Sequence, residues 1–231
     1  MNSIKISNWG YVECKSGFYT SSDLLSEKDI YCFHCGENIL RGEIDSGVWA
    51  VSYLLSMYTC APKDFVLGQP AVAEVDGVTV GLGELSKRTC YMDKTHYPLF
   101  RSKASVRRLI ERGLRKTHLT LSGVPLTVDD VCDMFRLDDE RSRRRISRGG
   151  SEALFSMAAV GYAHGRDIFC YPWYSVLRFN CFQYRLYYTF ELFEQLGLTA
   201  IVPVGLGEID DEGRNYFKVE IPYESDSCKN E

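Results

Sequence analysis

The sequence predicts an α/β protein with a mainly parallel sheet, a small antiparallel β part and a helical insertion. Three observations lead to this prediction. Strand and helix patterns alternate over residues 167–204, an Asp76-Gly77 pair interrupts an alternating apolar segment, and helical spacing recurs between residues 101 and 150. Strands that alternate with helices indicate parallel pairing with right-handed crossovers. We expect a single domain over residues 1–231, with a helical subdomain at about 101–150.

Size and composition limit the functional classes. The chain has 231 residues, enough for one domain with a substantial core. Its net charge of −4 makes a general nucleic-acid binder unlikely. The N-terminus is polar, and the longest apolar stretches, residues 48–58 and 153–163, are too short to span a bilayer. We therefore expect a cytoplasmic protein without membrane insertion.

The nine cysteines are scattered along the chain, and several lie in apolar runs. This pattern favours reduced thiols over a disulfide scaffold. Only Cys32-Phe33-His34-Cys35 has metal-ligand spacing. A structural zinc site needs four ligands, usually from two such pairs, and the sequence has no second CxxC. We expect no bound metal.

The first half of the chain mixes strand and helix signals. Asp76-Gly77 within AVAEVDGVTV is a strong hairpin signal. Ser105–Lys116 has the pattern of a basic amphipathic helix, and Thr127–Phe135 that of a short helix capped by Thr127 or Asp129. The remaining expected elements are a strand or strand pair at Ile30–Leu40, a helix after Gly47 and a strand at Thr89–Met92.

The second half has a clearer order. Ser151–Ala163 is small and apolar all round, which predicts a buried helix. His164 follows it, where a helix C-terminus favours an imidazolium, and we assign this histidine a structural role. Aromatic residues three and four positions apart predict a helix over Phe179–Phe193. Strands are expected at Asp167–Tyr171, Leu198–Val204 and Tyr216–Ile221.

Taken in order, these segments resemble an ATP-binding cassette (ABC-type) nucleotide-binding domain from about Ile30 to Val204. The counterparts of the family motifs would be Gly42–Met57, AVAEVDGVTV, YPLFRSKASVRRLIERGL, ISRGGSE, DIFCYP and LTAIVPVG. Pro172 lies 25 positions after Ser147, which matches the family spacing between the signature serine and the Asp-Glu-Pro proline. The resemblance implies a P-loop-NTPase-like (ABC ATPase-like) core.

The phosphate-binding loop departs from the family pattern. A P-loop needs glycines, a lysine that reaches the phosphates and a Ser or Thr that holds magnesium. The sequence has no lysine between Asp29 and Pro62, and Trp49-Ala50 stand where a cation and small residues would be required. We also interpret the loop as too short and bulky to wrap a phosphate. This comparison predicts degenerate Walker motifs.

The carboxylates that the resemblance would require are also absent. Cys170 and Tyr171 replace the aspartate and glutamate that serve magnesium and the attacking water. Leu177 takes the place of the D-loop aspartate, Val204 or Gly205 falls near the switch histidine, and Asp93 or Lys94 falls near the Q-loop glutamine. A hydrolytic site would thus lack its cation, metal ligand and base together.

The signature-like turn matches best, through Ser147, Gly149, Gly150 and Glu152. In the family this turn covers the γ-phosphate held by the opposite subunit, with backbone N–H groups at a helix N-terminus. A remnant could complete a composite site with an active partner. The simpler interpretation, which we favour, is that Ser147 caps the helix and the glycines form a tight turn.

Other patterns support weaker hypotheses. Basic residues gather at 101–116 and 141–148, with six acidic residues between them. We interpret these runs as a solvated face and consider nucleic acid improbable as a partner, while a partner protein or a nucleotide phosphate stays open. The four histidines have no metal spacing, and no local nucleophile motif occurs, so we assign no catalytic residue.

Our leading hypothesis is a catalytically inactive ABC ATPase-like protein, without a cofactor, that acts as a structural or regulatory binding subunit. The resemblance implies a homodimer or pairing with another protein subunit. The alternative is an ATP-binding subunit of an ABC transporter or ABC-type ATPase, active only with ATP and magnesium in a composite dimer. A third hypothesis drops the family and leaves a small α/β interaction protein.

Overall fold

The structure is a computed structural model. It describes residues 3–7, 12–14, 30–42, 51–52, 55–56, 65–67, 72–148, 152–209 and 217–220. In this part of the chain no helix is both long and apolar enough to cross a membrane. Trp49, Ala50, Gly149 and Gly150 lie outside the described residues.

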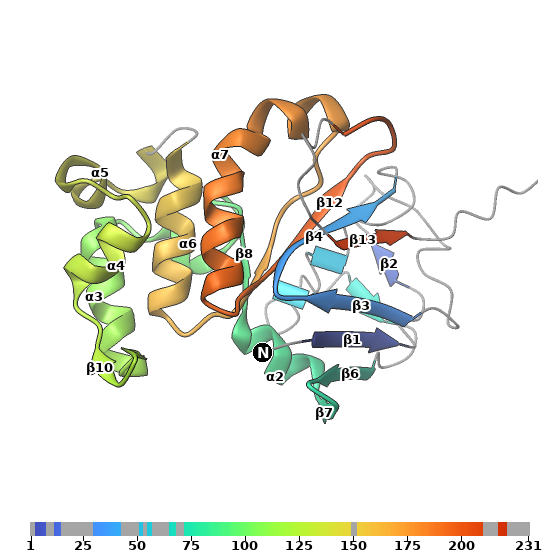
Figure 1. The fold of residues 1–231 in the computed structure, drawn as a ribbon, viewed down its shortest axis with the longest axis horizontal. Helices are drawn as coiled ribbons and strands as arrows, with labels where there is room; N and C mark the ends of the chain where they lie inside the picture. Colours follow the sequence, from blue (N-terminus) through green and yellow to red (C-terminus); the bar gives the residue numbers. More distant parts are fainter. Residues whose placement is uncertain are drawn as a thin grey trace, which may run out of the picture.

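A five-stranded, wholly parallel sheet forms the centre of the molecule (Figure 1). Its strand order is β13-β4-β12-β11-β8. The bounds are β4 Gly36–Arg41, β8 Thr89–Tyr91, β11 Ile168–Cys170, β12 Thr199–Val204 and β13 Phe217–Glu220. The predicted parallel α/β core is thus confirmed, and four of the five strands fall within or largely within the segments predicted for single strands.

An antiparallel sheet of order β3-β1-β6-β7 lies beside the parallel one (Figure 1). It contains β1 Ser3–Ser7, β3 Ile30–His34, β6 Val72–Val75 and β7 Val78–Val80, while β2 Val12–Cys14 pairs with β5 Phe65–Leu67 in a separate ribbon. The hairpin at Asp76-Gly77 is confirmed, with φ values of 50° and 80° that suit a type I′ turn.

The segment predicted as a strand or strand pair at Ile30–Leu40 divides between the two sheets. β3 pairs with β1, whereas β4 pairs with β12 and β13. Gly36 permits the change of direction because its φ is +83°, in the region that favours glycine. Asn38 stabilises the corner, since its amide donates to His34 O at 2.7 Å and its oxygen accepts from His34 N at 2.8 Å.

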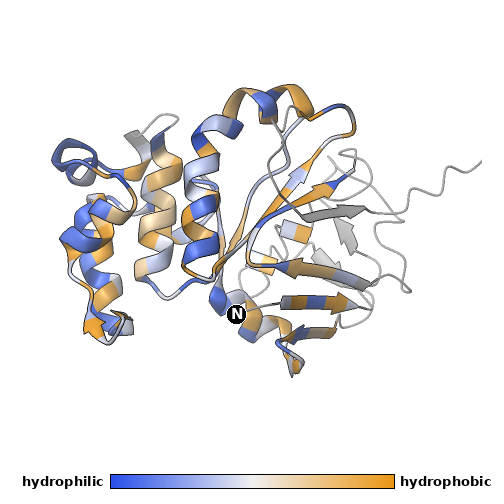
Figure 2. Ribbon diagram, in the orientation of Figure 1, coloured by the Kyte–Doolittle hydropathy of each residue, from blue (hydrophilic) through white to orange (hydrophobic). Residues whose placement is uncertain are grey.

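The helices form two groups. Helix α7 (Val176–Gln195) packs on β4 and β12, and α6 (Ala153–Ala163) lies next to it (Figure 1). Phe193 of α7 stacks on Phe169 of β11 at 4.3 Å, and Phe190 meets Tyr171 edge-on at 5.6 Å. Figure 2 shows that apolar residues are concentrated in these central strands and in α6. The predicted helices at 151–163 and 179–193 are confirmed, with slightly different ends.

The predicted helical region lies on the side of α6 away from α7 (Figure 1). It contains α3 Val106–Thr117, α4 Val128–Met134 and α5 Asp139–Arg143, with short 3-10 turns η2 Pro98–Arg101 and η3 Ile146–Arg148 and the hairpin β9 Thr120–Leu121 and β10 Val124–Pro125. The sequence did not predict α2, Leu82–Arg88, between the hairpin and β8. Thr127, not Asp129, caps α4, in a capping box completed by Asp130.

His164 corrects one expectation. The histidine follows α6 as predicted, but burial lowers its pKa, and this desolvation outweighs the hydrogen bond between Nε2 and Leu109 O at 3.1 Å. The imidazole is therefore neutral and joins α6 to α3. The macrodipole effect at a helix end is small beside the cost of burying a charge.

The crossing of α3 and α6 depends on Gly113. A Cβ at this position would lie 2.6 Å from the backbone carbon and oxygen of Ala163. The two helices could not keep their present separation with a larger residue there, because backbone atoms cannot rotate away as a side chain can.

We predict that Gly113→Ala destabilises the protein by about 1–2 kcal/mol. Overpacking costs about 1–3 kcal/mol, and the better helix propensity of alanine offsets up to about 1 kcal/mol of it. Urea denaturation would measure the change. Arg112→Ala, at an exposed neighbouring position on α3, is the control and should leave the midpoint nearly unchanged. Equal midpoints for the wild type and Gly113→Ala would contradict the close crossing.

Candidate functional site

Parallel strands bring their carboxyl ends to one edge of a sheet, and open α/β sheets usually bind ligands there. In this chain the edge contains Gly42 after β4, Gly205 after β12, Tyr171 after β11 and Met92 after β8. The sequence-predicted residues Cys170 and Tyr171 therefore lie at the position where a sheet of this kind would place a site.

Cys170 and Tyr171 are both completely buried. Burial raises the pKa of the Cys170 thiol to about 12, against a smaller opposite effect of the hydroxyls of Ser56 and Ser52. Burial also raises the pKa of Tyr171 well above its usual value. The Tyr171 hydroxyl has no hydrogen-bond partner among the described residues. Both groups are thus neutral at physiological pH and inaccessible to solvent.

Trp173 packs against the residues that follow β4 and β12. Its indole Nε1 donates to Gly42 O at 3.1 Å, and a Cβ on Gly205 would lie 3.1 Å from its ring. Backbone bonds close the same edge, from Gly42 N to Val204 O at 3.0 Å and from Gly205 N to Tyr174 O at 2.9 Å. The sequence analysis did not single out Trp173, although it follows the proline of the Asp-Glu-Pro-like segment directly.

Arg41 is a second residue that the sequence analysis missed. It ends β4, is buried, and donates a hydrogen bond to the carbonyl of Gly207. The alternating pattern of a strand could not reveal it, because its partner lies 166 positions away. A buried arginine at this edge supplies positive charge, but its guanidinium already bonds to the loop after β12.

The end of β4 also fixes where the loop after it begins. Because β4 ends at Arg41, the loop begins at Gly42, and Gly47 follows with four residues between them. This is the glycine spacing of a P-loop, and on this count the lysine position falls at Val48 rather than at Trp49. Residues 43–50 lie outside the described part of the chain, so the short, bulky loop stays a prediction.

The residues expected near a Q-loop form a local turn. Asp93 accepts hydrogen bonds from Thr95 N at 2.6 Å and from Thr95 Oγ1 at 2.6 Å, and its other oxygen lies 3.0 Å from His96 Nδ1. Partial burial favours a higher pKa for Asp93, but these hydrogen bonds together outweigh it and lower the pKa. Its carboxylate is therefore held by the turn after β8.

The signature-like residues do not form the helix cap that the sequence analysis favoured. Ser147 is exposed within η3, whereas the N-cap of α6 is Glu152, which makes no side-chain capping bond. The Glu152 carboxylate accepts from Arg141 Nη2 at 2.9 Å, so it pairs with α5. Ser147 does not cap α6. Leu177, expected at the D-loop aspartate, lies in the first turn of α7 and is 78% exposed.

The described residues include no group of three or more His, Cys, Asp or Glu side chains that could hold a metal ion. Mg²⁺ prefers oxygen ligands, and the end of β11 offers a buried thiol and a buried phenol. These residues do not fit a magnesium site. Cys32 and Cys35, the only pair in the sequence with metal spacing, are both half-buried thiols.

Comparison with known proteins supports the fold assignment. No protein-family model and no curated protein matches the sequence. Similar solved structures include a putative ABC transporter ATP-binding protein from Pyrococcus furiosus, with a TM-score of 0.58 and 10% identity over 95% of this chain and 97% of that chain.

Two further structures agree. An ATP-binding subunit of an ABC transporter has a TM-score of 0.52 and 10% identity, over 88% of this chain and 79% of that chain. CbiO1 from Clostridium perfringens, part of the ABC transporter complex CbiONQ, has a TM-score of 0.56 and 12% identity, over 89% and 80%. The chain therefore has an ABC ATPase-like fold, and the expectation from the sequence is confirmed at this level.

We predict that thiol labelling follows burial. At pH 8 iodoacetamide should modify the exposed Cys181 in the folded protein, whereas Cys90 and Cys170 should react only after unfolding. Peptide mass spectrometry with and without denaturant would measure this. Rapid native labelling of Cys170 would contradict the closed sheet edge.

We also predict that stability falls above about pH 9. The unfolded state loses the Cys170 proton near pH 9, whereas the folded state keeps it to a pKa of about 12. The unfolded state then binds fewer protons, so the free energy of unfolding decreases by up to about 1.4 kcal/mol per pH unit for each such group. Urea denaturation between pH 7 and 11 would measure the slope, which should be shallower in Cys170→Ala. An equal slope in both proteins would contradict the assignment to Cys170.

Proposed function

We propose that this chain is an ABC ATPase-like subunit that does not hydrolyse ATP by itself and acts as a structural or regulatory binding subunit in a dimer. The observation that carries this proposal is the end of β11, where Cys170 and Tyr171 are wholly buried and neutral. Hydrolysis needs a metal ligand and a base at such a position, and neither side chain can supply them at neutral pH.

The phosphate-binding loop supports the same proposal. Counted from Gly42 and Gly47, the lysine and the Ser or Thr of the P-loop pattern correspond to Val48 and Trp49. Valine cannot neutralise phosphate charge, and tryptophan cannot ligate magnesium. The glycine framework is thus retained, while the residues that would bind ATP and magnesium are replaced.

The second candidate is an ATP-binding subunit that is active only in a composite dimer. The resemblance to ATP-binding subunits of ABC transporters supports this wider class more directly than it supports inactivity. The exposed position of Ser147, before the 11-residue helix α6, favours a role on the surface. In this case the chain would contribute the Ser147 turn to nucleotide held by a partner, either a second copy or another subunit.

We predict that the purified chain releases no phosphate from ATP with magnesium above a protein-free blank, and that Cys170→Ala behaves identically. A malachite-green assay over a range of protein concentrations would measure release. Activity proportional to protein concentration, and retained through a second purification step, would contradict the proposal.

The composite alternative has its own test, in which the chain is assayed with a partner ATPase that co-purifies with it. If the Ser147 turn touches the partner's nucleotide, Ser147→Arg should lower hydrolysis by about 100-fold, as loss of a phosphate-stabilising donor does. Thr79→Arg, at an exposed position on β7, is the matched control. Equal rates for the two variants would reject a contribution from Ser147.

A further inference from the structure

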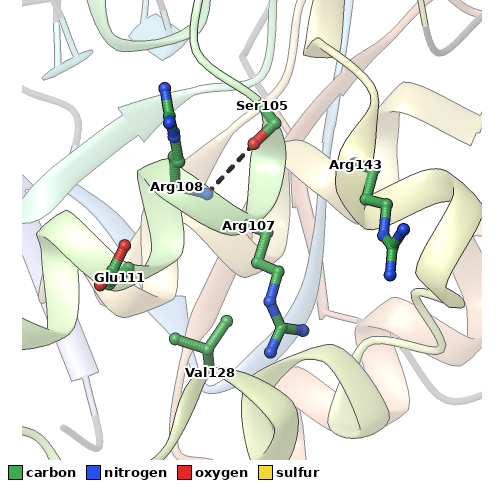
Figure 3. A pocket seen from close by; sticks show the side chains of 6 residues that line it. All are labelled: Ser105, Arg107, Arg108, Glu111, Val128 and Arg143. Carbon is green, nitrogen blue, oxygen red and sulfur yellow. Dashed lines mark hydrogen bonds between the residues drawn. The ribbon is translucent and has the colours of Figure 1, made fainter.

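A basic pocket lies on the helical part of the molecule, away from the sheet edge. Its volume is about 380 Å³, and it is open to solvent between α3, α4 and α5 (Figure 3). We call it the arginine pocket, and its lining residues are Ser105, Arg107, Arg108, Glu111, Val128 and Arg143. In Figure 3, Arg107 and Arg143 extend in the same direction from α3 and α5, with Val128 next to Arg107, whereas Arg108 extends from α3 toward the other side.

The pocket is formed by tertiary packing. Val106 N donates to Arg144 O at 2.9 Å, which fixes the start of α3 against the end of α5. Arg107 Nη1 bonds to Asp129 at 2.7 Å, which fixes α3 to α4. The three helices thus fix the positions from which the arginines line the pocket.

The charged residues that line the pocket, counted together with their ion-pair partners, carry a net charge of about +1. Arg107 pairs with Asp129, Arg143 with Asp139 at 2.7 Å, and Glu111 with Arg115 at 2.6 Å. No ion pair involves Arg108 in the described part of the chain. A ligand with one negative charge would therefore balance the pocket.

The existing ion pairs do not prevent the arginines of the pocket from binding a further carboxylate. Asp129 and Asp139 are both 72% exposed, and exposed ion pairs contribute little because water competes with them. A guanidinium also has five N–H donors, so it can bond to a second carboxylate while it retains the first. The isopropyl group of Val128 offers an apolar contact for the methylene groups of an acidic side chain.

The rim of the pocket argues against a polyanion. Asp129 and Asp139, which pair with lining arginines, are exposed beside it and would repel the successive phosphates of a nucleic acid strand. The same acidic rim would attract lysine or arginine residues that flank an acidic side chain. We propose that the arginine pocket receives a single Asp or Glu side chain of a partner protein, presented with basic residues on either side. This inference is independent of whether the chain binds ATP.

The test uses the ¹⁵N-labelled full chain and a short helical probe peptide with one central Glu and Lys residues four positions before and after it. The counterpart peptide has Gln in place of Glu. The Glu peptide should shift the amide signals of Ser105, Arg107, Arg108 and Val128 and bind about tenfold more tightly than the Gln peptide, since charge-assisted bonds to arginine are lost in the amide. In Arg108→Gln this preference should disappear.

Arg112→Gln is the matched control, because Arg112 is exposed on the same helix but does not line the pocket. It should keep the full preference for the Glu peptide. Equal binding of both peptides to the wild type, or an equal loss in Arg112→Gln, would overturn the proposal. Inorganic phosphate or an RNA oligonucleotide that shifts the same amides at lower concentration than the Glu peptide would also overturn it. Urea midpoints of the variants would confirm that each is folded.

Discussion

The structure depends on the burial of β11 between two parallel neighbours. Ile168, Phe169 and Cys170 pair with β12 on one side and β8 on the other, and all three are buried. Phe169 packs against Phe193 of α7, and Gly161 allows α6 to approach the same ring, since a Cβ there would lie 2.8 Å from it. One three-residue strand thus fixes both central helices relative to the sheet.

This burial determines which side chains the end of β11 can hold. An ionised carboxylate in such surroundings needs a metal ion or a donor to offset its desolvation. A thiol and an aromatic ring need neither, and their packing adds to the core. Trp173 then packs against Gly42 and Gly205, which follow β4 and β12. The sheet edge is therefore organised as an extension of the core, which is the physical basis of the proposed lack of hydrolysis.

Local patterns in the sequence predicted the helices and turns whose formation depends on residues close together in the chain. The aromatic spacing predicted α7, the Asp76-Gly77 pair predicted the β6–β7 hairpin, and Thr127, one of two cap candidates, predicted the start of α4. These features depend on helical periodicity, turn geometry and capping, all of which act over a few residues.

Other features depend on contacts between distant segments. β1 is short and mostly polar at its ends, and it becomes a strand because β3 and β6 pair with its two edges. Arg41 and Trp173 were missed because their partners, Gly207 and Gly42, lie far away in the sequence. The arginine pocket likewise exists only because α3, α4 and α5 meet. No pattern within one element could have predicted them.

The sheet edge and the helical part of the molecule differ in what their residues contribute. The first contributes to stability, and the second presents charged side chains to a partner. At the end of β11 the described side chains are buried, and the Tyr171 hydroxyl, which has no hydrogen-bond partner among the described residues, has no role in packing that Phe could not fill. In the helical part, by contrast, the charged pairs between Arg107 and Asp129 and between Arg143 and Asp139 are exposed and contribute little to stability. These ion pairs add little to the stability of the fold, yet they keep a defined arrangement. Recognition of a partner explains such an arrangement most readily. The charged pairs of the helical part are thus placed where a partner can reach them, whereas the described core around β11 contains neutral residues.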